Sequence, residues 1–202
     1  EVGEILQAPP GVVNQLQPGD EILAIAGQPV PDWPALFALP ETLPAAPSHD
    51  WTVRRNGVEI TVTAPDPAPP RISGVAPRSA ASAADLRPGD VVLAVEGRPI
   101  ARFTELRPAV EAAAGRPVAL RVWRPGVGEA DFALIPREQD LPTADGGYEK
   151  RWLIGVTGGE GYFRPATRTP GPVEALAIGA RQTRDVIWGS LTGIVAMVTG
   201  KI

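Results

Sequence analysis

The chain has 202 residues, 44% of them hydrophobic and 21% charged, so it can form one large domain or two small ones. It contains no cysteine and one histidine, which excludes a thiol nucleophile, a disulfide framework and a Cys/His zinc site within these residues. Its 24 prolines and 22 glycines predict many short elements and turns, and its few lysines exclude a lysine-rich nucleic-acid arm.

Charge is unevenly distributed along the chain. Residues 1–70 have two arginines and nine acidic residues, a net charge of −7, whereas residues 151–202 have six basic and three acidic residues, a net charge of +3. This distribution favours a membrane surface near the C-terminus and argues against nucleic acid as a partner. The first residues lack the basic and apolar regions of a signal peptide, and we interpret the sequence as a part of a longer protein.

Short strands and one short helix are predicted at the start of the chain. A Pro-Gly-Asp turn precedes a buried apolar strand, and Asn56-Gly57 is a strong hairpin signal. Nearby prolines limit the helix to about residues 32–39. Strands are expected at 2–6, 22–25, 51–54 and 58–63.

The same pattern then recurs. Residues 16–30 (LQPGDEILAIAGQPV) and residues 86–100 (LRPGDVVLAVEGRPI) are identical at eight of fifteen positions, at an offset of 70. We therefore interpret the chain as two copies of one domain, at 1–65 and 72–158, joined by a stiff proline-rich linker at 66–71. The remaining residues, 159–202, are expected to form a helical segment.

In the second copy a one-turn helix is expected at 79–84. A longer helix is predicted to begin with Thr104 as its N-cap and to end at Gly115. Strands are predicted at 72–76, 91–95, 118–123 and 131–135.

Residues Pro77 to Asp90 follow the pattern P-x-S-A-A-S-x-A-x-L-x-P-G-D, which resembles bacterial, permuted PDZ domains. The segments Gly27–Trp33 (GQPVPDW) and Val2–Ile5 resemble the first PDZ domain of RseP-type site-2 proteases. Residues 171–202 resemble the segment that returns those chains to the membrane. The resemblance implies an α+β fold: two tandem PDZ domains, each a small, partly open β-barrel or sandwich with two helices, and a C-terminal helical segment.

This resemblance also implies a function. It suggests a regulatory region on the periplasmic face of the bacterial inner membrane, in an intramembrane zinc protease that cleaves anti-sigma factors after a first cut by another protease. The family's H-E-x-x-H and L-D-G motifs are absent from these residues, so we expect no catalytic residue, metal ligand or cofactor in the fragment, and zinc in the parent metalloendopeptidase. The region would gate access of the cut transmembrane substrate by size exclusion, aided by C-terminal peptide binding. The alternative is an adaptor, or the PDZ tail of an HtrA-type serine protease.

A PDZ domain adds an extended peptide to a sheet edge beside a helix. The second copy offers such an edge at 153–156 and a facing helix at 104–114; the alternative for these apolar residues is a purely core role. The first copy passes from Thr63 directly into the linker, so its groove is expected to be incomplete or differently shaped. The candidate peptide-binding residues, for an extended or C-terminal segment of a transmembrane protein, are Leu153, Ile154, Gly155, Val156, Leu106, Val110 and Ala113.

Other segments carry weaker signals. Ser48-His49-Asp50 contains the residue types of a catalytic triad, but adjacent side chains diverge, so a polar turn is predicted. The glycine-rich residues 155–161 are interpreted as a flexible exit from the last strand. The uncharged run 186–200 is too short and too polar to cross a membrane alone, so residues 171–202 are expected to contact the membrane surface; a helix packed on protein is the alternative.

Overall fold

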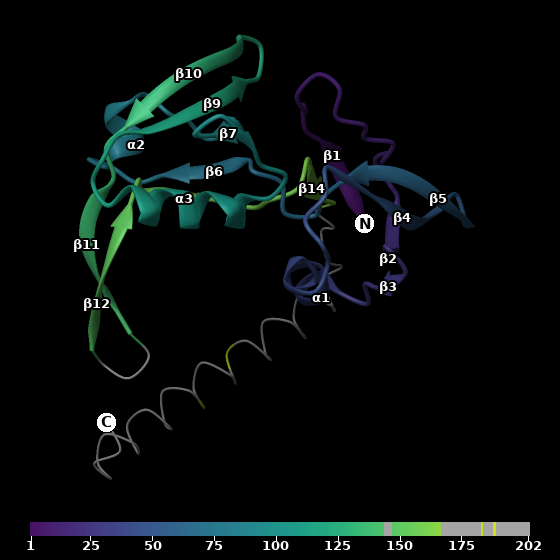
Figure 1. Cartoon of the computed structure of the whole chain (residues 1–202). Helices are drawn as coiled ribbons and strands as arrows, with labels where there is room; N and C mark the ends of the chain where they lie inside the picture. Colours follow the sequence, from purple (N-terminus) through teal and green to yellow (C-terminus); the bar gives the residue numbers. More distant parts are fainter. Residues whose placement is uncertain (144–146, 167–182, 184–187, 189–202) are drawn as a thin grey trace. The chain divides into compact units, whose positions relative to one another are not determined.

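The computed structural model describes residues 1–143 and 147–166, together with Thr183 and Trp188 (Figure 1). Residues 1–166 form one compact unit. Most of the expected helical segment at 159–202, and with it the expected membrane contact of residues 171–202, lies outside the described residues.

The first copy contains a four-stranded antiparallel sheet in the order β3-β2-β4-β5. Asn56 and Gly57, with φ of 52° and 80°, close the β4–β5 hairpin at the position that the sequence predicts. The elements are β1 (Val2–Ile5), β2 (Glu21–Ile25), β3 (Gln28–Pro29), α1 (Trp33–Ala38), the 3-10 helix η1 (Leu39–Glu41), β4 (Ser48–Arg55) and β5 (Val58–Pro65).

The second copy repeats this arrangement. Its sheet has the order β10-β9-β7-β8, which matches the first sheet strand for strand. The elements are β6 (Ile72–Val75), α2 (Ala80–Ala83), β7 (Val91–Val95), β8 (Arg98–Pro99), the 3-10 helix η2 (Phe103–Glu105), α3 (Leu106–Ala113), β9 (Val118–Arg124) and β10 (Gly128–Leu134).

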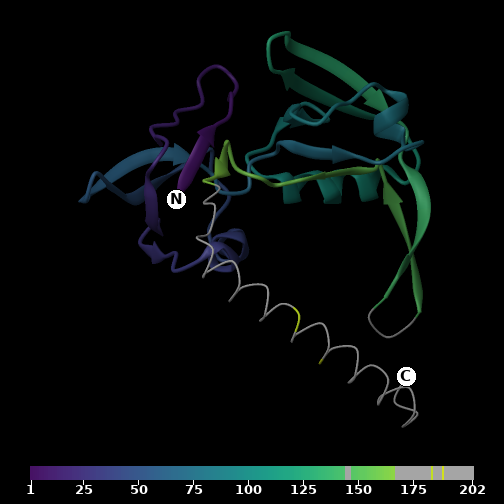
Figure 2. The same cartoon turned by 180° about the vertical axis from the view of Figure 1, so that it is seen from behind.

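Four further strands follow the second copy. An antiparallel hairpin of β11 (Arg137–Pro142) and β12 (Tyr148–Leu153) extends away from the sheet in both views (Figures 1 and 2). The strands β13 (Val156–Gly158) and β14 (Phe163–Pro165) come next. The sequence predicts only the start of β13 among these four.

The aspartate of each Pro-Gly-Asp turn is buried and has the same role in both copies. Asp20 accepts a hydrogen bond from Gln17 N at 2.8 Å and one from Arg55 Nε at 2.7 Å. Asp90 accepts the matching bonds from Arg87 N at 2.9 Å and Arg124 Nε at 2.8 Å. The Arg55 hydrogen bond is the largest cause of the lowered pKa of Asp20. Each turn is therefore tied to the end of its sheet by a charge-assisted hydrogen bond.

The strand that the first copy lacks in sequence is supplied by β14. β13 pairs with β6 and β14 pairs with β1, both antiparallel and in matching register: Val156 lies opposite Val75, and Phe163 lies opposite Ile5. β14 lies beside β1 in both views (Figures 1 and 2). The chain thus returns to the first copy after completing the second. The expected helical segment from 159 needs correction at its start, because residues 163–165 form β14, and the expected flexible exit at 155–161 needs correction because residues 156–158 form β13.

Three local predictions are wrong for identifiable reasons. Ser48-His49-Asp50 forms the start of β4 rather than a turn, because it pairs with the end of β5. The first copy has no counterpart of α2 among the described residues, since Pro9-Pro10-Gly11 makes a turn where the second copy has Ser and Ala. Thr104 lies inside η2 instead of capping a helix; the chain enters that helix through Arg102, whose N–H donates to Glu105 Oε2 at 2.8 Å.

Each copy has its own hydrophobic core. Val92, Leu120 and Leu134 are among the fully buried residues of the second copy. Trp51 lies at the centre of the first core and meets Phe163 of β14 edge-on, with ring centroids 6.0 Å apart. β14 thus contributes an aromatic ring to the core of the first copy as well as backbone pairing.

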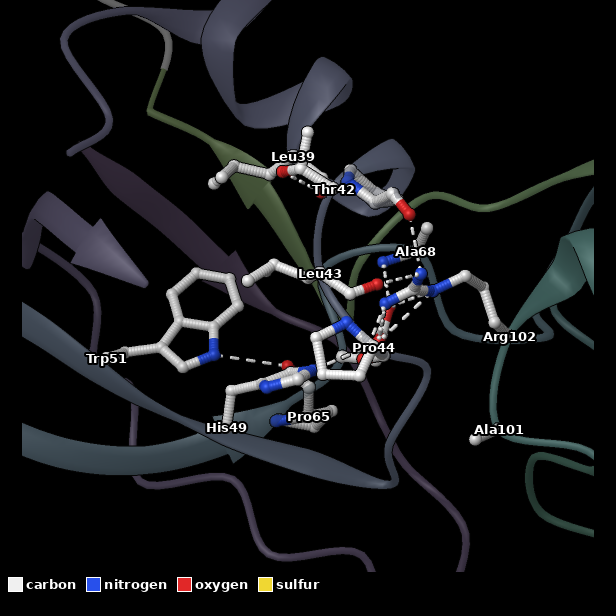
Figure 3. Close-up of polar contacts among 12 residues, drawn as sticks. Leu39, Thr42, Leu43, Pro44, His49, Trp51, Pro65, Ala68, Ala101 and Arg102 are labelled. Atoms are coloured by element: carbon white, nitrogen blue, oxygen red, sulfur yellow. Dashed lines mark hydrogen bonds and ion pairs between the residues drawn. The ribbon is translucent and has the colours of Figure 1, made fainter. Parts of the chain in front are cut away.

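The connection between the copies is buried, where the sequence predicts a stiff linker. Residues 64–70 are all buried. The Asp66 side chain, 1% exposed, accepts hydrogen bonds from Arg102 Nε at 3.1 and 3.2 Å and from Ala68 N at 2.9 Å. Figure 3 shows the Arg102 guanidinium reaching into the first copy, where it donates to the carbonyl oxygens of Leu43 at 2.9 Å and Pro44 at 3.2 Å. We call the Asp66 and Arg102 side chains, with the carbonyl groups that Arg102 contacts, the junction.

Candidate functional site

A cavity of about 350 Å³ lies between α3 and the segment that leads into β13. We call it the second groove. Helix α3 supplies an apolar wall, and residues 152–156 supply the opposite side. The lining residues are Phe103, Thr104, Leu106, Arg107, Pro108, Val110, Trp152, Leu153, Ile154, Gly155 and Val156.

The structure gathers six of the seven candidate peptide-binding residues around this groove. Leu106, Val110 and residues 153–156 all line it. Ala113 does not; it is buried in the core of the second copy. Because Leu106 and Val110 are also core residues, they serve both the packing of α3 and the groove wall.

Gly155 is required by its backbone conformation and by its surroundings. Its φ is +81°, and a Cβ atom at this position would lie 2.2 Å from Ser79 Cβ. A side chain at this position would collide with Ser79 at the start of α2, and this collision is sufficient to explain the glycine.

The backbone beside the groove has unused hydrogen-bonding groups. The Gly155 carbonyl accepts from Ala76 N at 2.8 Å, and the Ile154 carbonyl accepts from Ala81 N at 2.9 Å. Within the described residues, the N–H groups of Ile154 and Gly155 donate no hydrogen bond, and β13 pairs only with β6. Two free donors and a free strand edge are suited to the main chain of an extended peptide.

Charged side chains of the β11–β12 hairpin, next to the second groove, are paired with one another. Lys150 Nζ lies 3.2 Å from Glu138 Oε2, and Arg151 donates to Glu149 Oε2 at 2.8 Å. These hydrogen bonds raise the pKa of both Lys150 and Arg151. The second groove is therefore mainly apolar, with one charged side chain, Arg107, among its lining residues.

A second cavity, of about 500 Å³, lies between α1 and β14, and Arg71, Ser73 and Pro88 from beyond the first copy also line it. We call it the first groove. Trp33 and Leu36 of α1 stand 70 positions before Phe103 and Leu106, and Phe163 stands seven positions after Val156. The two cavities thus occupy equivalent places in the repeat.

Sequence reasoning missed the first groove because its strand comes from beyond the second copy. A signal was nevertheless present in the sequence. Residues 159–162 stand directly before Phe163, as residues 152–155 stand directly before Val156, and both Phe163 and Val156 are apolar. The Leu6 N–H donates to the Tyr162 carbonyl at 2.8 Å, as the Ala76 N–H does to Gly155.

Residues 71–124 match the PDZ domain family, so the second copy contains a PDZ domain. The chain is 32% identical over 137 residues to a protein of Rhizobium meliloti and 31% identical over 137 residues to a protein of Agrobacterium fabrum. Both carry the name "Putative zinc metalloprotease", and each alignment covers 67% of this chain and 36% of the relative. Together these similarities identify the chain as a PDZ region of the RseP type of site-2 protease.

A further relative is the magnetosome formation protease MamE of Paramagnetospirillum magneticum, which is 30% identical over 168 residues, covering 62% of this chain and 22% of that protein. The chain thus spans about a third of the length of the two metalloprotease relatives. No helix of the described residues is long and apolar enough to cross a membrane. Nor do any three His, Asp or Glu side chains in that part of the chain gather as metal ligands, so these residues do not fit a zinc site.

Proposed function

We propose that the second groove binds an extended or C-terminal segment of a protein. The observation that carries this proposal is the free edge of β13 beside an apolar cavity, with the unused N–H groups of Ile154 and Gly155 at one end. A peptide main chain can extend the β6–β13 pair, and an apolar side chain can enter between α3 and residues 153–156.

We further propose that the region gates substrate access to a zinc metalloendopeptidase on the periplasmic face of the bacterial inner membrane. The names of two relatives support a metalloprotease parent, whose zinc and catalytic residues would lie outside this chain. A compact unit of residues 1–166 joined by a buried junction suits a rigid obstacle that excludes bulky substrates by size. The substrate would be a transmembrane protein such as an anti-sigma factor, already shortened by a first protease.

A second candidate is a peptide-binding adaptor or the PDZ tail of an HtrA-type serine protease. It rests on the similarity to a relative named as a protease without a stated class, MamE, which leaves this alternative open beside the metalloprotease. The groove chemistry would be the same, but the parent would use it to capture C-termini. Sequencing outward from the fragment separates the two parents by the presence of H-E-x-x-H or of a serine protease motif.

Peptide binding is tested with the fragment itself. A peptide selected from a library of displayed free C-termini is titrated against the wild type and against Thr104→Trp, in which an exposed residue of the groove is enlarged. We expect Thr104→Trp to weaken binding by about tenfold or more, since hot-spot contacts contribute on the order of 2 kcal/mol. Glu129→Trp, at an exposed position of β10 outside the groove, is the matched control. Equal affinities for all three proteins would refute the assignment.

Gating is tested in the full-length parent. Replacing residues 1–166 with a flexible linker should allow premature cleavage of an intact substrate. The deletion must include β14, because it pairs with β1 and would otherwise be left without its partner. The Thr104→Trp variant should still exclude the intact substrate if exclusion is by size. If the parent without residues 1–166 still spares the intact substrate, the gating proposal fails.

A further inference from the structure

Arg71 is a mostly buried cation that lines the first groove. Its side chain is 14% exposed, and Arg71 lies outside the first copy, directly before β6 and at the start of the PDZ match. Within the described residues its guanidinium donates no hydrogen bond, and the nearest carboxylate oxygen, Glu160 Oε2, is 3.9 Å away on a side chain that is 65% exposed.

Three other mostly buried arginines each donate hydrogen bonds to a buried carboxylate. Arg55 and Arg124 each donate to the buried aspartate of a Pro-Gly-Asp turn, and Arg102 donates to Asp66. A buried charge without hydrogen-bonded partners is costly, and functional sites are where such charges are retained. Arg71 thus stands out as a cation that lacks a close anionic partner.

The surroundings of Arg71 indicate which anion would fit. Glu160 and Gly161 line the first groove and stand seven positions after Leu153 and Ile154, which line the second groove; the buried Tyr162 follows directly, as Gly155 follows Ile154. Within the described residues, the N–H groups of Gly161 and Tyr162 donate no hydrogen bond. A guanidinium group together with free backbone N–H groups is suited to a carboxylate.

Apart from Ser73 and Arg164, whose guanidinium donates to Glu4 Oε2 at 2.9 Å, the remaining walls of the first groove are mostly apolar. Trp33, Leu36 and the 63%-exposed Phe37 form the α1 side. β14 pairs only with β1 among the described strands, so its other edge is open. These features favour a peptide over a free inorganic anion, because they offer an apolar pocket and a strand edge beside the charge.

We propose that the first groove is a second peptide site, and that Arg71, which lies outside the first copy and directly before β6, is its receptor for a terminal carboxylate. The proposal rests on the proposed peptide-binding function, and extends it to a composite site that requires both copies. It assigns the carboxylate to Arg71 and the Gly161 and Tyr162 amides, and the last side chain to the α1 wall.

The test compares N-acetyl-Ala-Leu-Val with its C-terminal amide, titrated into the ¹⁵N-labelled fragment. The indole signal of Trp33 reports on the first groove and that of Trp152 on the second. At Trp33 we expect the acid to bind roughly tenfold or more tightly than the amide, the ratio expected for a charge-assisted hydrogen bond. Arg71→Gln should reduce this ratio to about one, Arg71→Lys should keep part of it, and Arg98→Gln, at an exposed position of β8, should leave it unchanged.

Two results would overturn the proposal. One is equal affinity of acid and amide at Trp33 in the wild type, which decides the matter even if an Arg71 variant fails to fold. The other is a response confined to Trp152, which would leave peptide binding by the second groove intact. Conversely, a carboxylate-dependent response at Trp33 alone would support this proposal and count against the second groove.

Discussion

Removing the Arg102 guanidinium from the junction should destabilise the fold by an amount that can be worked out from the structure. Arg102→Met keeps an unbranched apolar side chain but removes the guanidinium group. The Asp66 carboxylate would then stay buried without its main cationic partner, and the carbonyl groups of Leu43 and Pro44 would each lose a donor. The change therefore breaks a buried ion pair from one side only.

The size of the effect follows from this burial. The side chains of Arg102 and Asp66 are 5% and 1% exposed, so solvent cannot replace the lost contacts. Removing one partner of a buried, hydrogen-bonded ion pair costs about 3–5 kcal/mol. We expect Arg102→Met to lower the free energy of unfolding by that amount. Asp66→Asn should cost less, because Arg102 keeps its backbone acceptors.

Urea unfolding followed by tryptophan fluorescence measures both variants and the double variant. Because the two side chains contact each other directly, the double variant should lose at least about 1 kcal/mol less than the sum of the single losses. The surface pair of Arg121 and Asp131, 57% and 73% exposed, is the control, and its removal should be nearly neutral. A loss below about 1 kcal/mol for Arg102→Met, or strict additivity, would refute the reasoning.

Three further predictions concern the turns and strands. Gly155→Ala should cost at least about 2 kcal/mol in urea unfolding, from its positive φ and the clash with α2, whereas Gly126→Ala, at a φ of +74° with open space, should cost about 1; equal losses would contradict this explanation. The Arg55 hydrogen bond depresses the pKa of Asp20 below its ordinary 3.8, so its stabilisation is present above that pH and lost as the pH falls through the lowered pKa. Unfolding titrations below pH 4 should show this loss in the wild type but less in Asp20→Asn, and identical slopes would contradict it. Phe163→Ala should cost about 3–5 kcal/mol and unfold the first copy preferentially; a loss under 1 would mean that β14 does not complete its core.

Much of the sheet structure is predictable from the sequence because its signals are local. The Pro-Gly-Asp turns and Asn56-Gly57 each act within a few residues. The repeat at an offset of 70 shows this local pattern twice, and the strands that it predicts are present. The pairing of β14 with β1 joins residues about 160 positions apart, and three-residue strands carry no periodic signal of their own. Local patterns alone therefore could not predict how the first copy is completed.

The candidate site likewise divides into a part that local sequence signals predict and a part that depends on long-range contacts. The apolar spacing of Leu106 and Val110 and the short run at 153–156 suffice to predict the second groove, and the structure gathers them around one cavity. Ala113 shares the helix spacing but faces the core, which spacing alone does not distinguish. The first groove and its Arg71 depend on contacts between distant parts of the chain, and the sequence signal for the groove, residues 159–162, lies beyond both copies.

The central claim is that the second groove holds a peptide against β13 and α3. Intermolecular nuclear Overhauser effects between the selected peptide and the methyl-labelled fragment test it most directly. We predict contacts from the last peptide side chain to the methyl groups of Leu106 and Val110, together with shifts of the Ile154 and Gly155 amides. Contacts to another face of the second copy, with these signals unchanged, would contradict the account.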